Sequence, residues 1–360
     1  MQEALSLARI ALGDVSPNPA VGAVVVKGNE VIGRGYTQPP GQAHAEIVAL
    51  HQAGEAARGA ILYVTLEPCC HYGRTPPCTE AIINAGISEV HVALIDPNPA
   101  VNGKGLDCLE QAGIRTVLGE GKEEAGEIVE AYAKFITTGI PFVTAKFAMS
   151  LDGKIATSGG DSKWISSESS RNYSHSLRNQ HDAIMAGINT VLKDDPRLTV
   201  RCGEEGAGIS RKQPVRIIID SYGRTPLNAR ILSEAGKTII AVGGEVSIQR
   251  KQQLVEKGAE LLELNVINGF IDLKQLVKEL GKKSITSIMV EGGGSVLGSL
   301  FDQKIVDKVV SFIAPVIIGG ENARSPVGGQ GVDMISEAYR LVNVKYTHFE
   351  NDIMVSGYLR

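Results

Sequence analysis

Several residues in the first quarter of the chain have the types and the spacing that metal-assisted hydrolysis requires. His44 and Glu46 are separated by one residue, and three cysteines lie in one ten-residue stretch downstream: Cys69, Cys70 and Cys78. One imidazole and two thiolates can hold zinc in three positions and leave a fourth position for water. The metal lowers the pKa of that water, and a nearby carboxylate can carry its proton to a leaving group. These residues are therefore typical of a hydrolytic zinc centre.

The pattern also matches the H-x-E and P-C elements by which zinc nucleobase deaminases are recognised. The H-A-E triplet occupies 44–46 and the P-C pair occupies 68–69. Glu46 favours a catalytic site, because a closed structural site has no use for such a carboxylate. A structural zinc site or a non-enzymatic scaffold is the alternative, since four ligands are available: Cys69, Cys70, Cys78 and either His44 or His71.

Helix geometry restricts where such a metal can lie. The stretch 44–55 has the pattern of a helix, on which positions i and i+2 lie about 200° apart. His44 and Glu46 can therefore converge on one ion only beyond the N-terminal end of this helix. Thiolates at that end would also be stabilised by the helix dipole.

The elements that must position these residues alternate along the first part of the chain. Helices are expected near 2–12, 44–55, 79–87, 104–112 and 122–137, and strands at 20–26, 31–36, 61–66, 90–95 and 114–118. A hairpin followed by alternating helices and strands is typical of an α/β fold with layers on both faces of the sheet.

A domain boundary is expected at 137–141, where T-T-G-I-P ends a helix and a strand at 142–150 begins. This boundary divides the chain into domains 1–140 and 141–360. The second domain is also expected to be α/β, with an antiparallel tail and a polar, glycine-rich loop at 203–213. Its other strands are expected at 214–220, 238–242, 287–292, 308–319 and 353–359, and its helices near 167–179, 247–258, 271–280 and 295–303.

Composition and charge exclude several classes of protein. The chain has 360 residues, enough for two domains, with 43% hydrophobic and 21% charged residues, as in soluble globular proteins. No apolar run approaches the about 18 residues of a membrane span, and the N-terminus lacks the basic region of a signal peptide. The odd count of five cysteines argues against a disulfide framework. We therefore expect a cytoplasmic protein.

The charge is divided unevenly between the two domains. Residues 1–140 contain 9 Lys and Arg against 16 Asp and Glu, net −7, and the remainder contains 27 against 24, net +3. An acidic first domain without a basic or aromatic stripe disfavours a deaminase that acts on nucleic acid.

The cysteine stretch carries a longer motif that identifies a family. Eight residues, C-H-Y-G-R-T-P-P, separate Cys69 from Cys78, where the short deaminase signature has two. Together with S-P-N-P at 16–19 and D-P-N-P at 96–99, this loop resembles the bifunctional riboflavin-biosynthesis proteins. In that family a diaminohydroxyphosphoribosylaminopyrimidine deaminase is fused to a 5-amino-6-(5-phosphoribosylamino)uracil reductase. The resemblance extends over nearly the whole chain. It implies an N-terminal, cytidine-deaminase-like three-layer α/β/α domain and a C-terminal, dihydrofolate-reductase-like α/β domain.

The resemblance implies roles for individual residues of the first domain. His44, Cys69 and Cys78 would be the ligands of one zinc ion, and Glu46 would move protons. Cys70 stands where relatives often have Ser, so it is left out of the metal set. Turn formation is an alternative role for the asparagines of the two P-N-P triplets. The expected contacts to the pyrimidine and ribose phosphate of the substrate are Asn18, His71, Arg74, Asp96 and Asn98.

The second domain contains a strand–glycine–helix motif, V-E-G-G-G-S-V-L-G-S-L at 290–300, where a helix N-terminus can meet phosphate. It is not G-x-G-x-x-G, so a Rossmann unit is disfavoured. The resemblance makes this turn part of an NADPH site, whose expected residues are Ala148, Trp164, Thr190, Asp194, Ser221, Gly293, Gly294, Ser295, Val296, Leu297, Gly298 and Ser299. The expected contacts to the second substrate are Lys146, Ser162, Arg178, Leu198, Arg201 and Glu291.

Two of these residues have an ordinary structural alternative. A lone Trp, such as Trp164, is most often a core residue, and Arg178 could be an exposed helix residue. Lys146 and Asp194 are candidates for handling the proton that the reduction requires.

The resemblance implies two successive reactions in one chain. The first is zinc-dependent hydrolytic deamination of 2,5-diamino-6-ribosylamino-4(3H)-pyrimidinone 5′-phosphate. The second is reduction by NADPH of the ribosyl group of 5-amino-6-(5-phosphoribosylamino)uracil to ribityl. Small phosphorylated pyrimidines are the expected partners, nucleic acid and membranes are not, and a homo-oligomer is expected. The alternative is a deaminase whose second, reductase-like domain has lost its activity. The intact G-D-S-K-W and D-D-P-R-L-T-V-R motifs disfavour this alternative.

Overall fold

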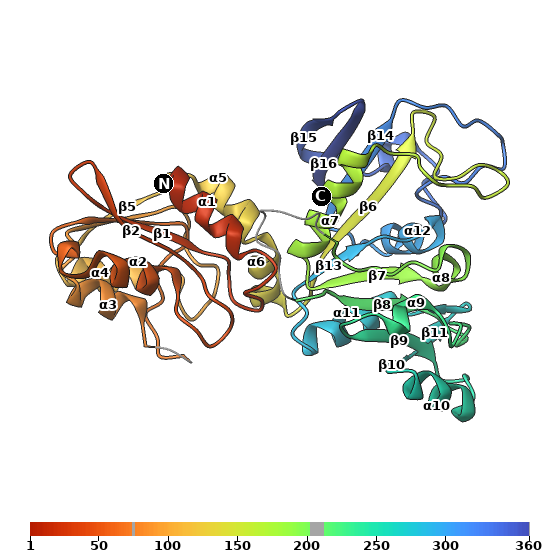
Figure 1. Ribbon diagram of the computed structural model, residues 1–360, viewed down its shortest axis with the longest axis horizontal. Helices are drawn as coiled ribbons and strands as arrows, with labels where there is room; N and C mark the ends of the chain where they lie inside the picture. Colours follow the sequence, from red (N-terminus) through yellow and green to blue (C-terminus); the bar gives the residue numbers. More distant parts are fainter. Residues whose placement is uncertain (74–75, 202–211, 360) are drawn as a thin grey trace. The chain divides into compact units, whose positions relative to one another are not determined.

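The computed structural model describes residues 1–73, 76–201 and 212–359. The chain forms two compact units, Met1–Ile140 and Pro141–Arg360 (Figure 1). Most of the glycine-rich stretch expected at 203–213 lies outside the described residues. Among the helices formed by the described residues, none is both long and apolar enough to span a membrane.

Unit 1, Met1–Ile140, is a five-stranded sheet with helices on both faces (Figure 1). The strand order is β2-β1-β3-β4-β5, in which β3, β4 and β5 are parallel and β1 is antiparallel to both neighbours. The strands are β1 (Gly22–Lys27), β2 (Glu30–Tyr36), β3 (Ile61–Val64), β4 (Glu89–Val92) and β5 (Arg115–Leu118). The helices are α1 (Gln2–Ala11), α2 (Ala45–Ala53), α3 (Cys78–Asn84), α4 (Lys104–Gln111), α5 (Lys122–Ile128) and α6 (Glu130–Thr138), with a 3-10 turn at Gly54–Ala57.

Helix α2 lies unusually close to the β1–β2 hairpin, and glycine makes this possible. A Cβ added to Gly35 would lie 2.1 Å from the carbonyl oxygen of Ala45, so a side chain at this position would displace the helix. The apolar residues of α2 and of the hairpin join the buried core of this unit, with Ala45, Ala49 and Val25 fully buried. This packing fixes the N-terminal end of α2, where His44 is the cap residue.

The last helical stretch of unit 1 differs from the single helix expected across 122–137. It is divided into α5 and α6 at Val129, whose φ of −101° and ψ of 10° depart from helical values. Helix α6 ends at Gly139 in the left-handed conformation, with φ 71°, and β6 (Phe142–Ser150) begins three residues later.

Unit 2, Pro141–Arg360, contains a nine-stranded sheet of order β10-β9-β8-β7-β13-β6-β14-β16-β15. Its strands are β6, β7 (Ala183–Gly187), β8 (Val215–Ile219), β9 (Thr238–Gly243), β10 (Ala259–Leu264), β13 (Ser287–Val290), β14 (Lys308–Ala314), β15 (Leu341–Phe349) and β16 (Asp352–Leu359). A separate hairpin pairs β11 (Val266–Ile267) with β12 (Phe270–Ile271). The helices are α7 (Glu168–Gln180), α8 (Ile188–Asp194), α9 (Arg230–Ser233), α10 (Ile248–Glu256), α11 (Leu273–Lys282) and α12 (Gly294–Asp302), with a 3-10 turn at Ile335–Glu337.

Seven of these strands are parallel to one another, and β16 and β15 add the antiparallel tail. The central parallel strands are buried on both faces. In β7, Ala183 and Met185 face one apolar cluster, whereas Ile184 and Ala186 face the other. Burial on both sides explains why these strands are continuous apolar runs rather than alternating ones.

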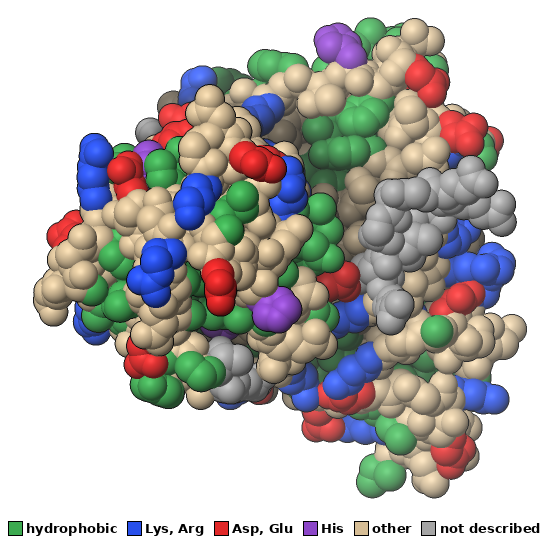
Figure 2. All heavy atoms as spheres, turned by 60° about the vertical axis from the view of Figure 1, so that its left-hand side comes forward, with side chains coloured by type: hydrophobic (Ala, Val, Ile, Leu, Met, Phe, Trp, Pro, Cys, Tyr) green, Lys and Arg blue, Asp and Glu red, His purple; other side chains and the backbone are tan. Residues whose placement is uncertain are grey.

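The surface carries charges of both signs. On the face shown in Figure 2, the described Lys and Arg side chains are interspersed with Asp and Glu and form no continuous basic stripe.

Candidate active sites

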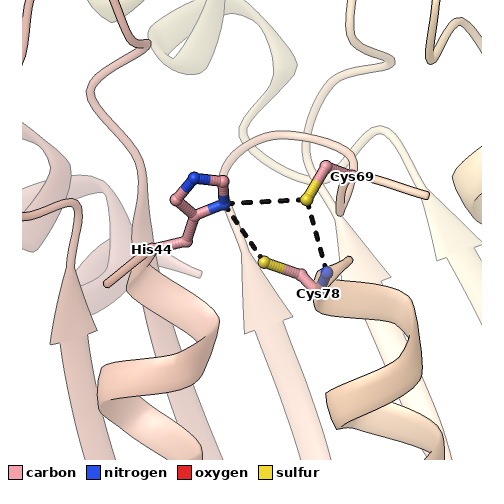
Figure 3. A group of neighbouring side chains, drawn as sticks. All are labelled: His44, Cys69 and Cys78. Carbon is pink, nitrogen blue, oxygen red and sulfur yellow. Dashed lines mark hydrogen bonds between the residues drawn. The ribbon is translucent and has the colours of Figure 1, made fainter. Parts of the chain in front are cut away.

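The first site lies where α2, α3 and the segment after β3 meet. His44 caps the N-terminus of α2, Cys78 is the first residue of α3, and Cys69 follows β3. The Nδ1 atom of His44 lies 3.3 Å from Sγ of Cys78 and 3.6 Å from Sγ of Cys69, and the backbone N–H of Cys78 donates to Cys69 at 3.3 Å (Figure 3). The three side chains thus gather at the N-terminal end of α2, where the spacing predicts a metal.

The dimensions of this group fit zinc. Zn–S bonds of about 2.3 Å and Zn–N bonds of about 2.0–2.1 Å imply N···S edges of about 3.6 Å in a tetrahedron. The two observed N···S distances, 3.3 and 3.6 Å, agree with that value. Among the described residues, the group of possible metal ligands here consists of His44, Cys69 and Cys78, without Cys70 or His71. Three protein ligands leave one position open, as in a catalytic rather than a structural site.

The charges of the group also suit a cation. The hydrogen bonds from Cys78 and His44 lower the pKa of Cys69 to about 4, so this residue is a thiolate at neutral pH. The hydrogen bond with Cys69 in turn raises the pKa of His44. Glu46, only 4% exposed in the first turn of α2, has its pKa raised to about 7, by burial first and then by the charge of Cys69. Glu46 is thus held beside the ligands in a site where it can take up and release a proton.

A cavity of about 300 Å³ opens beside this group. Its lining includes two ligands, His44 and Cys69, together with Asn18 and His71. Of the five expected substrate contacts of unit 1, these two are the ones that line the cavity, and Arg74 lies outside the described residues.

Asp96 and Asn98 lie outside the lining of this cavity and hold a turn. Asp96 is buried and accepts hydrogen bonds from the N–H of Asn98 at 2.9 Å and from the hydroxyl of Tyr132 at 3.0 Å. The side-chain oxygen of Asn98 accepts from the N–H of Ala100 at 3.0 Å. These are the contacts of an Asx turn, so the turn role of Asn98 is observed in this structure.

Glu67 is a buried residue of this site that the spacing argument does not identify. Its carboxylate, 3% exposed, accepts hydrogen bonds from the backbone N–H groups of Asp96 at 3.1 Å, Gly103 at 2.9 Å and Gly105 at 2.8 Å. Glu67 therefore ties the segment before the cysteines to the loop between β4 and α4. The feature of the sequence that could have identified Glu67 is its position directly before Pro68-Cys69.

The second site is a cavity of about 400 Å³ in unit 2, near the carboxyl ends of β6 and β13. Strand β13 returns between β6 and β7, and ligands bind at such points of parallel sheets. Seven expected residues line the cavity: Lys146, Ala148, Ser162, Trp164, Arg178, Arg201 and Glu291. The lining thus combines residues expected at the substrate with two expected at NADPH.

A buried ion pair forms the floor of this cavity. Arg178 binds Glu291 through two parallel hydrogen bonds, Nε to Oε1 at 2.5 Å and Nη2 to Oε2 at 2.8 Å, and Nζ of Lys146 lies 3.9 Å from the same carboxylate. Burial opposes ionisation of Glu291, but the charges of Arg178 and Lys146 overcome it and lower its pKa to about 2. Burial lowers the pKa of Lys146. Arg178 is therefore not an exposed helix residue.

Trp164 is not a core residue either. It is 71% exposed, and the guanidinium of Arg171 lies 4.6 Å from the centre of its ring. Arg171 also donates to the carbonyl of Ser166 at 2.6 Å. Arg171 and His175 are among the polar residues of α7 that line the same cavity and that the motifs do not identify. Their helical spacing from Arg178 was the only signal in the sequence.

The other residues expected at NADPH lie outside the lining of this cavity. Gly293 caps α12 and faces Thr190, whose Oγ1 would be 3.9 Å from an added Cβ, so the turn is open to a ligand there. Leu297 is fully buried in the core, and Gly298 faces the backbone of Gly328. Asp194 ends α8, and Ser221 follows β8 and accepts from the N–H of Gly243. Leu198 is buried beside Thr199, whose carbonyl accepts from Arg178.

Two family models match the chain, one in each unit. Residues 1–94 match the cytidine and deoxycytidylate deaminase zinc-binding region, and residues 141–355 match the RibD C-terminal domain. The deaminase match includes His44, Cys69 and Cys78, and the second match begins at the boundary between the units.

Similarity to known proteins extends over the whole chain. The riboflavin biosynthesis protein RibD of Aquifex aeolicus is 45% identical over 356 residues, covering 99% of this chain and 96% of that protein. The structure of Acinetobacter baumannii RibD, form 1, superposes with a TM-score of 0.87 at 36% identity and covers 100% of this chain and 97% of that one. A diaminohydroxyphosphoribosylaminopyrimidine deaminase/5-amino-6-(5-phosphoribosylamino)uracil reductase from Thermotoga maritima gives a TM-score of 0.84 at 34% identity, with coverage of 100% and 97%.

Proposed function

This chain belongs to the RibD family of bifunctional riboflavin-biosynthesis proteins, and we propose that its two units divide that family's two reactions between them. Unit 1 removes an amino group hydrolytically from 2,5-diamino-6-ribosylamino-4(3H)-pyrimidinone 5′-phosphate. Unit 2 then reduces the ribosyl group of 5-amino-6-(5-phosphoribosylamino)uracil to ribityl. The observation that carries the proposal is the group of His44, Cys69 and Cys78 beside Glu46 and an open cavity.

In unit 1, the residues of the chain bind the pyrimidine and move protons. His44, Cys69 and Cys78 would hold zinc, which would supply an acidified water. Glu46 is placed to take up a proton and to deliver it to the ring and then to the departing amine, as its burial and raised pKa support. Asn18 and His71, which line the cavity, bind the substrate. Arg74, outside the described residues, is the expected ligand of its phosphate.

In unit 2, the cationic cavity binds the phosphorylated sugar. Glu291 fixes the guanidinium of Arg178 and keeps Lys146 close, so these groups surround the reacting sugar in one geometry. Lys146, whose pKa burial lowers, can donate the proton that the reduced sugar needs. Asp194 is not supported as the donor, because it lies outside the cavity lining.

The expected cofactor of unit 2 fits the glycine turn before α12. An open backbone at Gly293 and the N-terminus of α12 suit a phosphate. NADPH supplies the hydride, and the protein orients it. The cofactor would be held by the backbone of the turn 293–295, by Thr190 and by the exposed face of Trp164. The side chain of Leu297 packs in the hydrophobic core instead.

The partners are small phosphorylated pyrimidines, and the protein works in the cytoplasm as a homo-oligomer. Clustered, unpaired cysteines support a reducing compartment.

The edge strand β15 supports association of copies, since it exposes Val344 and Tyr346 at the free edge of the sheet. Light scattering at several protein concentrations tests the oligomer; a monomer at all of them contradicts it.

The deaminase is tested by Glu46→Gln in the full chain. Ammonia release from the diaminopyrimidine should fall at least about a hundredfold. The zinc content should be unchanged, and NADPH oxidation with the deaminated pyrimidine should stay normal. Retained ammonia release would refute the role of Glu46, and zinc loss would show that it supports the metal instead.

The reductase is tested by Arg178→Lys with the deaminated substrate. Lys keeps the charge but cannot form the two parallel hydrogen bonds to Glu291, so kcat/KM for NADPH oxidation should fall sharply. Ammonia release is the control and should not change. If the wild-type protein releases ammonia but never oxidises NADPH, the reductase assignment is refuted and only the deaminase assignment stands.

A further inference from the structure

The segment Thr199–Arg201 leads to the second cavity, which Arg201 lines, and its backbone is held from two sides. On one side, Nη1 of Arg178 donates to the carbonyl of Thr199 at 3.1 Å, and the backbone N–H of Arg201 donates to Nδ1 of His175 at 3.2 Å. On the other side, the amide side chain of Gln213 accepts from the N–H of Val200 at 2.9 Å. The side chains of Arg178, His175 and Gln213 thus hold the backbone of this segment in place.

His175 and Arg178 can grip the same segment because they are three residues apart on α7. Residues at this spacing lie on one face of a helix. Nη1 of Arg178 also lies 3.4 Å from Nδ1 of His175, so the two side chains brace each other.

The hydrogen bond from Arg201 determines the state of the imidazole. A backbone N–H can only donate, so Nδ1 of His175 must be the acceptor and the ring proton must be on Nε2. The charged groups that face the ring are Arg178 and Lys146, Arg201 itself, and Glu291. Burial, together with the charges of Arg178 and Arg201, lowers the pKa of His175 to about 4, so the ring is neutral at physiological pH.

Arg201 differs from the other cations of the cavity. Arg178 is bound to Glu291, Lys146 lies close to the same carboxylate, and Arg171 lies over the ring of Trp164. Arg201 lines the cavity with an exposed side chain, and its backbone N–H forms the hydrogen bond to His175. Its exposed guanidinium can therefore meet an anion in the cavity.

We propose that His175 is a positioning residue of the reductase: its neutral imidazole holds the backbone of Arg201 so that the guanidinium meets the phosphate of the sugar substrate. The proposal rests on the function proposed for unit 2. Nothing in this role touches the hydride or the reacting sugar carbon, so it should act on substrate binding and not on the chemical step.

Two isosteric substitutions separate this role from simple packing. In His175→Asn, the Oδ1 atom occupies the position of Nδ1 and can still accept from Arg201. In His175→Gln, the acceptor moves to the position of Nε2 and the N–H of Arg201 is left unpaired. Losing one such hydrogen bond should raise KM for the phosphorylated uracil about fivefold to tenfold in His175→Gln, with kcat unchanged. His175→Asn should restore KM to near the wild-type value.

A second pair of variants shows whether the effect passes through Arg201. In an Arg201→Ala background, His175→Gln should add no further increase in KM, because the guanidinium that it positions is gone. Equal KM values for His175→Gln and the wild type would overturn the proposal, as would an undiminished effect of His175→Gln in the Arg201→Ala background. NADPH affinity and ammonia release should stay normal in every variant, which shows that the protein is folded.

Ribose 5-phosphate distinguishes failure of this proposal from failure of the proposed function. Its affinity, measured by calorimetry on the full chain, does not depend on turnover. It should weaken about fivefold to tenfold in His175→Gln and remain normal in His175→Asn. If the wild type never oxidises NADPH but these affinities behave as expected, the reductase assignment is wrong and the positioning role stands. If the wild type reduces its substrate and the affinities are all equal, the positioning role is wrong.

Discussion

The buried carboxylate of Glu67 accepts a 2.8 Å hydrogen bond from the backbone N–H of Gly105, in the first turn of α4. The same carboxylate accepts from Asp96 and Gly103. One side chain, two residues before the ligand Cys69, thus connects the zinc segment to the D-P-N-P loop. This connection holds the D-P-N-P turn against the segment that carries Cys69.

Glu67→Gln should disable the deaminase without removing a metal ligand. The amide places an NH₂ group against backbone donors, so at least one buried N–H loses its acceptor, at a cost of about 2 kcal/mol. The expected result is a lower midpoint of urea unfolding for unit 1, slower ammonia release and normal NADPH oxidation. Glu123→Gln, at an exposed residue of α5, is the matched control. Equal unfolding midpoints for the two variants would contradict this role of Glu67.

Removal of zinc should separate the two reactions. Within the described part of the chain, the group of residues that can hold the metal lies in unit 1, and the cavity of unit 2 is lined by residues of unit 2. After treatment with a chelator, ammonia release should disappear and NADPH oxidation with the deaminated pyrimidine should persist. Added zinc should restore the first reaction. Parallel loss of both activities would show that unit 2 depends on the metal.

Gly298→Ala should weaken the cofactor turn. A Cβ at this position in α12 would lie 2.2 Å from the carbonyl carbon of Gly328, so helix or loop must move, at a cost of about 1–3 kcal/mol. We expect weaker NADPH binding by fluorescence titration and a lower thermal midpoint. In Gly126→Ala, within α5, an added Cβ has no neighbour within 4 Å, and the helix should gain about 1 kcal/mol. If Gly298→Ala bound NADPH normally, the close contact would be irrelevant to the turn.

Acid should destabilise unit 2 partly through His175. Its pKa is lowered from 6.5 to about 4 in the folded state. Below pH 6.5 the unfolded chain therefore binds a proton at His175 that the folded chain does not bind. Stability should therefore fall as the pH decreases from 6.5 to about 4. Glu291, with a folded pKa of about 2 against 4.5, adds a loss that begins near pH 4.5.

The check is urea unfolding of the wild type and His175→Asn at a series of pH values. Between pH 6.5 and pH 4.5 the unfolding free energy of the variant should decline less steeply, and below about pH 4 the two slopes should converge. Identical slopes throughout would mean that His175 is solvated when the protein is folded.

The sequence by itself determined the chemistry and most of the elements. Imidazole, thiolate and carboxylate at fixed spacing specify a metal site because few other uses require that combination. Continuous apolar runs specify the strands of unit 2, since strands covered on both faces have no polar side. The local patterns leave three strands of the nine-stranded sheet unpredicted. Strand β7 is a run of five buried apolar residues, too short to be distinguished from a buried helical segment, and β10 and β15 are the two edge strands.

Only the tertiary structure decided which side chains share a space. It brings Cys78 to His44 and leaves Cys70 aside, exposes Trp164 and buries Leu297. His175 has no motif, and its role depends on a hydrogen bond to a residue 26 positions away. Such contacts depend on how helices and strands pack, which residue type and spacing along the chain do not encode locally. The residue types and their spacing therefore predict the chemistry, whereas the tertiary structure determines which side chains lie close enough to position the reacting groups.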